Sequence, residues 1–277
     1  MNKLPVGLQV YGLRDLLEAT PERFREVMIQ VRKLGYDGVE LAGTYGIAPE
    51  EIRNILCDAD LIPISAHVPL IDMMRDAQAI ANVYKTIGCK YIVVPYLPEE
   101  YRHHTPGYAR VLVEMERIGK IMVNNGLALM YHNHDFEFVT LEDQTFGLDD
   151  IYAKVPRQYL MAEPDTCWIQ VAGQDAAAYV RKYKGRCPIV HLKDYIKVGN
   201  PCGMYKLIGM EAEEVKEDNA FFEFRPVGFG QQIWVPILDA ACDADAEWVV
   251  VEQDEHYDLS SLECARRSRE YLRILGW

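Results

Sequence analysis

Two histidines and an acid follow a run of apolar residues near the middle of the chain. His132 and His134 come directly after the run at 127–131, and Glu137 stands three residues further on. Because side chains alternate between the two faces of a strand, residues two positions apart point the same way. The spacing therefore predicts two imidazoles together at the end of a buried strand, where they can bind a metal ion or transfer protons.

Polar residues also end the other strand-like runs of the sequence. These groups are Gln9 and Tyr11, Glu40, His67, Pro95 and Tyr96, Glu163 and Asp165, His191, Lys193 and Asp194, and Glu252, Gln253 and Asp254. Charged side chains are seldom buried without partners, so acids and imidazoles gathered at one place predict a bound cation. Mixed Asp, Glu and His ligands favour Mn²⁺, Zn²⁺, Co²⁺ or Fe²⁺ over Ca²⁺. The alternative is that some of the acids pair with Lys193, Arg14 or Arg225.

The order of the elements explains how these groups come together. Apolar strand-like runs are expected at 6–11, 38–41, 61–67, 91–94, 127–131, 159–163, 188–192 and 248–252. Helical patterns separate them; the first begins at Thr20 and Pro21 and ends at Gly35. Eight such units without a break in composition predict an α/β fold, a (β/α)₈ TIM barrel forming a single domain over residues 1–277. Active sites of such barrels lie at the carboxyl ends of the strands.

Other architectures and sites receive less support from the sequence. A doubly wound sheet would usually carry a glycine-rich turn after its first strand, and no such turn follows Tyr11. The segment 195–225 is polar and contains glycine, so we expect little regular structure there. Trp168 is equally compatible with a wall for a sugar ring and with core packing.

Composition limits the partners of the chain. The net charge of −13 at pH 7 and the pI near 5.0 disfavour a nucleic-acid partner. The longest apolar runs are far shorter than the roughly 20 residues that span a bilayer, so we expect no membrane contact. Seven cysteines without a CxxC pair indicate a reduced protein, and no early segment has the signature of a signal peptide. We therefore expect a cytoplasmic location.

Five segments together give the sequence a family resemblance. They are the runs at 7–15 (GLQVYGLRD), 131–138 (YHNHDFEF), 165–168 (DTCW), 190–194 (VHLKD) and 251–254 (VEQD). The joint pattern resembles the sugar phosphate isomerase/epimerase family, within the xylose isomerase-like TIM-barrel superfamily that also holds inosose dehydratases, ketose 3-epimerases and endonuclease IV. Endonuclease IV has additional zinc histidines that are missing here, and Trp168 occupies the place of one of them.

The resemblance implies one divalent metal held by side chains from the fifth to the eighth strands. Asp165, His191 and Glu252 match the ligands of the last three strands. His132 stands where the fifth strand usually has a glutamate, and His134 and Glu137 remain alternatives for this ligand. Mn²⁺ is the favoured ion, with Co²⁺, Zn²⁺, Mg²⁺ and Fe²⁺ as alternatives.

The implied chemistry is the removal of a proton next to the carbonyl of a sugar or keto-sugar, through a metal-stabilised enediolate. We expect Glu252 to act as one base, His134 or His132 as its partner, and Lys193 to stabilise the developing charge. The expected substrate-binding residues are Gln9, Tyr11, His67, Glu137 and Trp168. The predicted activity is that of an isomerase or epimerase.

Several alternatives stay open. One is a lyase or dehydratase of the same fold that acts on inososes or 3-oxo-glycosides, including C-glycoside cleavage with a partner subunit. Two rivals from other classes are a phosphodiester nuclease and a non-catalytic barrel subunit. The chain can form a homo-oligomer or a hetero-oligomer, and the sequence does not distinguish these.

Overall fold

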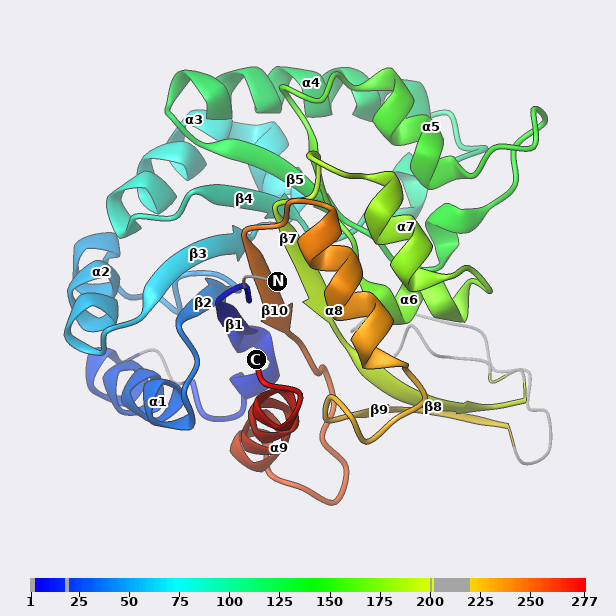
Figure 1. The fold of residues 1–277 in the computed structure, drawn as a ribbon. Helices are drawn as coiled ribbons and strands as arrows, with labels where there is room; N and C mark the ends of the chain where they lie inside the picture. The colour runs from blue at the N-terminus through cyan, green and yellow to red at the C-terminus, as the bar shows by residue number, and fades with distance from the viewer. Residues whose placement is uncertain (1–2, 18–19, 200, 202–219) are drawn as a thin grey trace.

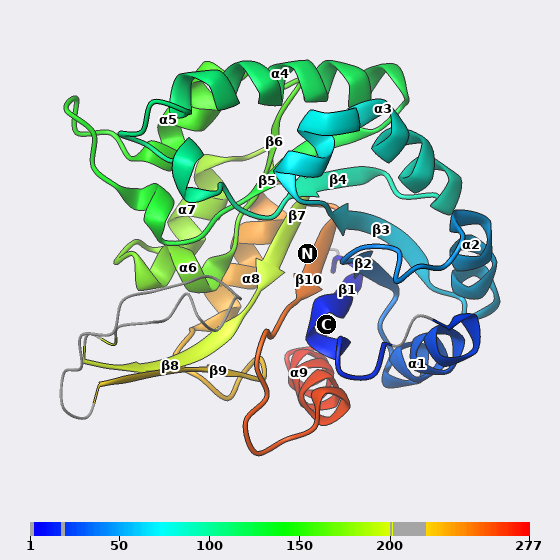
Figure 2. The same cartoon turned by 180° about the vertical axis from the view of Figure 1, so that it is seen from behind.

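The computed structural model describes residues 3–17, 20–199, 201 and 220–277. Eight parallel strands form one sheet in the order β6-β5-β4-β3-β2-β1-β10-β7, and helices surround it (Figures 1 and 2). The strands are β1 (Val6–Gln9), β2 (Gly38–Leu41), β3 (Ile62–His67), β4 (Tyr91–Val94), β5 (Ala128–His132), β6 (Met161–Glu163), β7 (Ile189–Leu192) and β10 (Trp248–Val251). The predicted (β/α)₈ TIM barrel is confirmed.

The two end strands of this sheet, β6 and β7, meet at a seam that nearly closes the barrel. Asp165 and His191 form an isolated parallel bridge there. The backbone N–H of His191 donates to the carbonyl of Pro164 (2.9 Å), and that of Ala162 donates to the carbonyl of Arg186 (2.9 Å). The seam therefore has fewer backbone hydrogen bonds than a full strand pair, and two residues of the candidate site lie directly on it.

Helices surround the sheet, and the first of them begins and ends where the sequence predicts. They are α1 (Pro21–Leu34), α2 (Pro49–Asp58), α3 (Leu70–Ile87), α4 (Tyr108–Asn124), α5 (Gly147–Lys154), α6 (Thr166–Val171), α7 (Ala176–Lys182), α8 (Trp234–Asp243) and α9 (Ser261–Ile274). Thr20 caps α1, its side chain accepting the N–H of Arg23, and Gly35 ends the helix at φ 93°. In the described part of the chain, no helix combines the length and the apolar character needed to cross a bilayer.

Two elements differ from the sequence expectation. The six-residue helix α6 was not predicted; it begins at Thr166, and the carboxylate of Asp165 caps it. The segment 195–225 was expected to be irregular, yet β8 (Asp194–Val198) and β9 (Phe221–Arg225) pair as an antiparallel hairpin. Its physical basis is a small aromatic core in which Phe222 and Phe224 pack against Trp168. Residues 200 and 202–219 of that segment lie outside the described residues.

Candidate active site

Alternation along the strands builds two layers inside the barrel. The first layer is apolar and consists of Ile64, Tyr91, Val93, Met130, Ile189 and Val250. Two residues beyond the last three of these stand His132, His191 and Glu252, all of them buried. Residues i and i+2 of a strand share a face, so the polar residues form a second layer over the apolar one. Packing of the apolar layer thus holds imidazoles and carboxylates at the carboxyl ends of the strands.

The four metal ligands expected from the sequence meet in this polar layer. Ligand atoms of His132, Asp165, His191 and Glu252 all lie within 4.8 Å of one another, and we call these residues the first quartet. His132 Nε2 lies 3.3 Å from Asp165 Oδ2 and 3.5 Å from Glu252 Oε2. Among the described residues, neither His132 Nε2 nor Asp165 Oδ2 has a hydrogen-bond partner, although both atoms are buried. Two imidazoles and two carboxylates with unpaired buried atoms fit a divalent cation.

Asp165 is oriented by the helix that it caps. Its Oδ1 accepts the backbone N–H groups of Cys167 (2.8 Å) and Trp168 (3.1 Å). Its own backbone N–H donates to the side-chain oxygen of Asn133 (3.0 Å). With Oδ1 used for capping, Oδ2 is the oxygen that faces His132 and remains available for a cation.

A second quartet of ligand-type residues adjoins the first. It consists of Glu40, His67, Glu163 and His191, so His191 belongs to both quartets. Glu40 is held in place by Gln9, whose Nε2 donates to Oε1 (2.7 Å), and by Ser65, whose Oγ donates to Oε2 (2.6 Å). Burial alone would lower the pKa of His67, but the charges of Glu40 and Glu163 raise it to about 10.

Lys193 is the buried cation of the site. Its Nζ lies 2.8 Å from Asp254 Oδ2, 2.9 Å from Glu252 Oε2 and 3.5 Å from Asp165 Oδ2. Burial alone would lower the pKa of Lys193, but these carboxylates hold it well above its usual range. Burial would likewise raise the pKa of Glu252, yet Lys193 and His191 hold it well below its usual range. The pair is therefore charged at neutral pH.

His134 differs from His132 in its surroundings. Burial, together with the charges of His132 and Lys193, holds the pKa of His134 well below its usual range. Its ring stacks on that of Phe136, with 5.2 Å between the ring centroids, and packs against that of Trp168, with 5.1 Å between the centroids. Since β5 ends at His132, His134 lies just beyond the strand, but its ring is still only 5.2 Å from that of His132. His134 is thus a neutral imidazole next to the first quartet.

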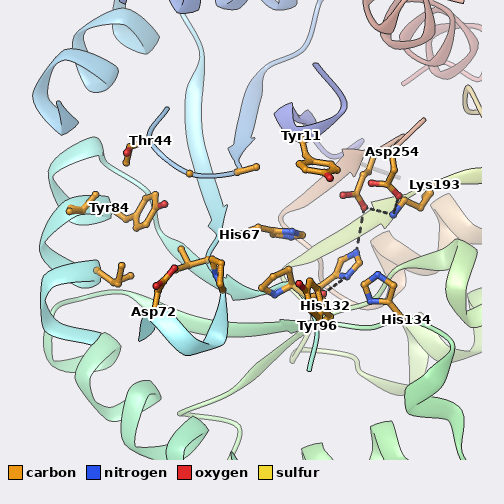
Figure 3. A pocket seen from close by; sticks show the side chains of 18 residues that line it. Tyr11, Thr44, His67, Asp72, Tyr84, Tyr96, His132, His134, Lys193 and Asp254 are labelled. Atoms are coloured by element: carbon orange, nitrogen blue, oxygen red, sulfur yellow. Dashed lines mark hydrogen bonds and ion pairs between the residues drawn. The ribbon is translucent and has the colours of Figure 1, made fainter. Parts of the chain in front are cut away.

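A cavity of about 700 Å³ opens onto these residues (Figure 3). Of the expected site residues, the ones that line it are Tyr11, His67, His132, His134, Lys193 and Glu252. Figure 3 shows His132, His134, Lys193 and Asp254 at one end of the cavity and Thr44, Asp72 and Tyr84 at the other, with His67 between them. The cavity therefore has a charged end and an end formed by the loop after β2 and by α3.

Three residues expected to contact substrate are not among those that line this cavity. Gln9 is fully buried and donates to Glu40. Glu137 contacts the hydroxyl of Tyr131 and accepts the N–H of His134 (2.8 Å). Trp168 is fully buried, with its ring stacked 5.7 Å from that of Phe222. The positions of these three side chains indicate that they support the residues of the site.

The structure adds residues to which the sequence assigned no role. Glu40, Glu163 and Asp254 were recognised only as strand ends. For two of them the spacing indicated a place on the same face as an expected ligand, because Glu163 precedes Asp165 by two residues and Asp254 follows Glu252 by two. Burial raises the pKa of Asp254 to about 6, although Lys193 opposes this shift. The remote lining residues, such as Asp72 on α3, had no sequence signal.

Comparisons with known proteins agree with the fold. Residues 29–275 match the sequence profile of a family described as xylose isomerase-like TIM barrel. An inosose dehydratase of Clostridium perfringens (strain 13 / Type A) is 25% identical over 279 residues, covering 90% of this chain and 89% of its own length. A sugar phosphate isomerase/epimerase structure from Parabacteroides distasonis has a TM-score of 0.77 at 20% identity, over 99% of this chain and 94% of its own. A xylose isomerase-like barrel from Mycobacterium smegmatis, solved in complex with magnesium, has a TM-score of 0.68 at 16% identity. The match covers 99% of this chain and 98% of the Mycobacterium protein.

Proposed function

The chain belongs to the xylose isomerase-like TIM barrel family, and we propose that it is a metal-dependent isomerase or epimerase. In this proposal the enzyme removes a proton next to the carbonyl of a small sugar or keto-sugar and then returns a proton to the substrate. The observation that carries this proposal is the first quartet at the charged end of the cavity, with Lys193 beside it. The similar proteins described as isomerases, epimerases and dehydratases are compatible with this proposal.

The first quartet is the proposed metal site, and Mn²⁺ is the proposed ion. His132, Asp165, His191 and Glu252 offer two nitrogens and two carboxylates, a ligand set that suits Mn²⁺, Zn²⁺, Co²⁺ or Fe²⁺. When bound, the ion would supply Lewis-acid stabilisation of negative charge on a neighbouring substrate oxygen. Magnesium in one solved relative is compatible with a divalent ion in this fold.

The protein groups divide the proton transfer between them. Glu252 is ionised, lines the cavity and can accept the proton from carbon. His134 is neutral and also lines the cavity, so it can accept or relay a proton at the same end of the cavity. Lys193 holds three N–H donors at the same end and can stabilise an oxygen anion as it forms.

Elimination of water is the second candidate, and one feature favours it. Glu252 is the single first-quartet carboxylate among the described residues that line the cavity, so proton exchange between two opposed carboxylates lacks its second member. Asp254 lies at the same end with its pKa raised to about 6, which allows it to carry a proton to a leaving hydroxyl. The inosose dehydratase relatives are compatible with this outcome.

Solvent-deuterium exchange tests the proposal for both outcomes. The Mn²⁺-loaded protein is incubated in D₂O with ketoses, inososes and 3-oxo-glycosides, and products are followed by NMR. We expect deuterium at the carbon next to the carbonyl; a new epimer or isomer supports the first candidate, and loss of water supports the second. His134→Asn should slow the exchange by about 10²–10⁴-fold, the usual contribution of an acid–base group.

The remote cap residue Asp175 supplies a matched control. Its side chain caps α7 and lies outside the cavity lining, so Asp175→Asn should exchange at the wild-type rate. Absence of carbon-bound deuterium with all three substrate classes, from protein shown to contain metal, would overturn the proposal.

A further inference from the structure

We propose that the barrel contains a second divalent-cation site, formed by the second quartet (Glu40, His67, Glu163 and His191), with the imidazole of His191 bridging two ions. This inference concerns the metal content of the protein and does not depend on the proposed reaction. It starts from four side chains on two pairs of consecutive strands, β2 and β3 in the first part of the chain and β6 and β7 beyond its middle.

The four ligand atoms of the second quartet converge on one point. His67 Nε2 lies 2.8 Å from Glu163 Oε2 and 3.0 Å from Glu40 Oε1. His191 Nε2 lies 2.8 Å from the same Glu40 oxygen and 3.4 Å from the same Glu163 oxygen. Glu40, Glu163 and His191 are fully buried, while His67 lines the cavity and gives the site an entrance.

Unpaired atoms point to a missing ligand. Among the described residues, His191 Nε2 is buried without a hydrogen-bond partner. Glu163 Oε2, the oxygen that faces the two imidazoles, pairs with His67 (2.8 Å), while the other oxygen of the same carboxylate, Oε1, is buried and unpaired. In contrast, both oxygens of Glu40 accept side-chain hydrogen bonds, from Gln9 and Ser65, which fix the carboxylate. Buried side-chain nitrogen and oxygen atoms are normally paired, so unpaired ones inside a set of metal-ligand types indicate an ion.

The two nitrogens of His191 give the strongest argument. Nδ1 lies 3.0 Å from Glu252 Oε2, and Nε2 lies 2.8 Å from Glu40 Oε1. A neutral imidazole has one N–H, so it cannot satisfy carboxylates on both sides. Either the ring is a protonated imidazolium, or cations stand between its nitrogens and the carboxylates. The geometry of the two quartets favours a cation on each side.

Charge balance agrees with two ions. In the part of the chain that the structure describes, five buried carboxylates surround this centre, those of Glu40, Glu163, Asp165, Glu252 and Asp254, and the buried cation among them is Lys193. With neutral His67 and His132 and a bridging imidazolate at His191, five negative charges remain, of which two divalent ions would offset four. With one ion, two negative charges remain, and two histidines must then be protonated. Uncompensated buried charge is strongly unfavourable.

The ligand set also defines the class of ion. Two carboxylates and two imidazoles suit Mn²⁺, Zn²⁺ or Fe²⁺, whereas Ca²⁺ prefers oxygen ligands alone. When the second ion binds, the remaining N–H proton of His191 leaves to solvent and the ring becomes a bridging imidazolate. Binding of the second ion should therefore release a proton, which can be measured in weakly buffered solution.

Metal counting on the full-length protein tests the inference. The protein is stripped with a chelator, dialysed against Zn²⁺ or Mn²⁺, and analysed for bound metal. We expect two ions per chain, and anomalous scattering from zinc-loaded crystals should give one peak on each side of His191. One ion per chain at saturation, with one anomalous peak, would overturn the inference and leave His191 as an imidazolium.

Variants separate the two sites. Glu163→Gln should lower the content from two ions to one, and Asp165→Asn should remove the ion of the first quartet. Glu137→Gln is the matched control, because Glu137 is a buried carboxylate of the same barrel that belongs to neither quartet, and it should keep two ions. Two ions in folded Glu163→Gln would contradict the inference. If that variant does not fold, the wild-type anomalous map decides.

The outcome is distinguishable from failure of the proposed function. Two ions without any carbon-bound deuterium would overturn the reaction and leave the second site intact. One ion with normal exchange would overturn the second site and leave the reaction intact.

Discussion

At the scale of single residues, Lys193 connects the charged groups of the site. It is buried and faces three carboxylates, of which Asp254 and Glu252 lie within 2.9 Å of its Nζ. Removing one partner of a buried charge network leaves the others uncompensated, whereas removing both partners costs less. The stability of the metal-free protein should therefore depend strongly on this amine.

The first prediction concerns that amine. In metal-free protein, Lys193→Met should lower the free energy of unfolding by about 3–5 kcal/mol, because the carboxylates around it lose their counter-charge. The double variant Lys193→Met/Asp254→Asn should recover part of this loss. Urea denaturation followed by circular dichroism measures both. Equal stability of wild type and Lys193→Met would show that the carboxylates are already protonated.

The second prediction concerns Glu137. Burial raises the pKa of this carboxyl to about 7, although hydrogen bonds from Tyr131 and the His134 amide oppose the shift. A raised pKa in the folded state means that the folded protein binds a proton more tightly than the unfolded chain between about pH 4.5 and 7. Stability should therefore fall as pH rises through this window, since the charged carboxylate is disfavoured inside the fold.

Glu137→Gln isolates this contribution. The variant keeps the side-chain shape and removes the titration, so its free energy of unfolding should decline less between pH 4.5 and 7 than that of the wild type. Denaturant titrations of both metal-free proteins across the window give the difference curve. A difference that stays constant with pH would mean that Glu137 titrates alike in the folded and unfolded states.

Strand alternation explains which site residues the sequence could predict. His132, His191 and Glu252 each follow an apolar strand residue by two positions, so their convergence was readable. The position of Glu137 was not readable, because β5 ends at His132 and the 3₁₀ turn at Phe136–Phe138 carries Glu137 back toward Tyr131. The second quartet depends on contacts across the barrel that strand spacing alone does not specify.

At the scale of elements, α6 shows how a short helix positions a ligand. The eight-strand pattern was clear because each strand is an apolar run. The helix α6 has only six residues, too few for a periodic hydrophobic pattern. The hairpin of β8 and β9 is stabilised by Trp168, which stands 27 positions before Tyr195 in the chain. The sequence therefore missed α6 because it is short and the hairpin because its packing partner is distant in the chain.

The third prediction separates the two roles of Asp165. In Asp165→Asn the amide oxygen can still accept the N–H groups that cap α6, but the negative charge toward His132 is lost. We expect unchanged helix content by circular dichroism and a large loss of metal affinity by calorimetry, of at least about tenfold. Asp175→Asn, the equivalent change at the cap of α7, should leave metal affinity unchanged. Equal metal affinity in Asp165→Asn would show that Asp165 is only a cap.

At the scale of the whole molecule, buried charge and barrel closure are linked. The chain carries a net charge of −13, and several of its acids lie inside the barrel rather than on the surface. Folding without a cation must offset the repulsion among them. A ligand that binds only the folded state stabilises it by mass action, by about 4 kcal/mol at a free concentration 1,000 times its dissociation constant. We therefore expect chelation to lower the melting temperature, measured by calorimetry with and without added Mn²⁺.

The seam between β6 and β7 gives this linkage a location. Asp165 belongs to one side of the seam and His191 to the other, and both are members of the first quartet. An ion held by both residues would act as a clamp across the weakest junction of the barrel. Its removal should then allow this junction to open locally long before the whole barrel unfolds.

Amide hydrogen exchange, measured with and without metal, tests whether the ion stabilises this seam. In metal-free protein, the amides of Ala162 and His191, which bond across the seam, should exchange with solvent faster than in the loaded protein. Amides between β3 and β4, far along the sheet order from the seam, should change little. Equal acceleration at both places would point to global destabilisation instead. The metal ligands would thus determine how often the pairing between β6 and β7 opens locally. They would therefore set the lifetime of the closed barrel.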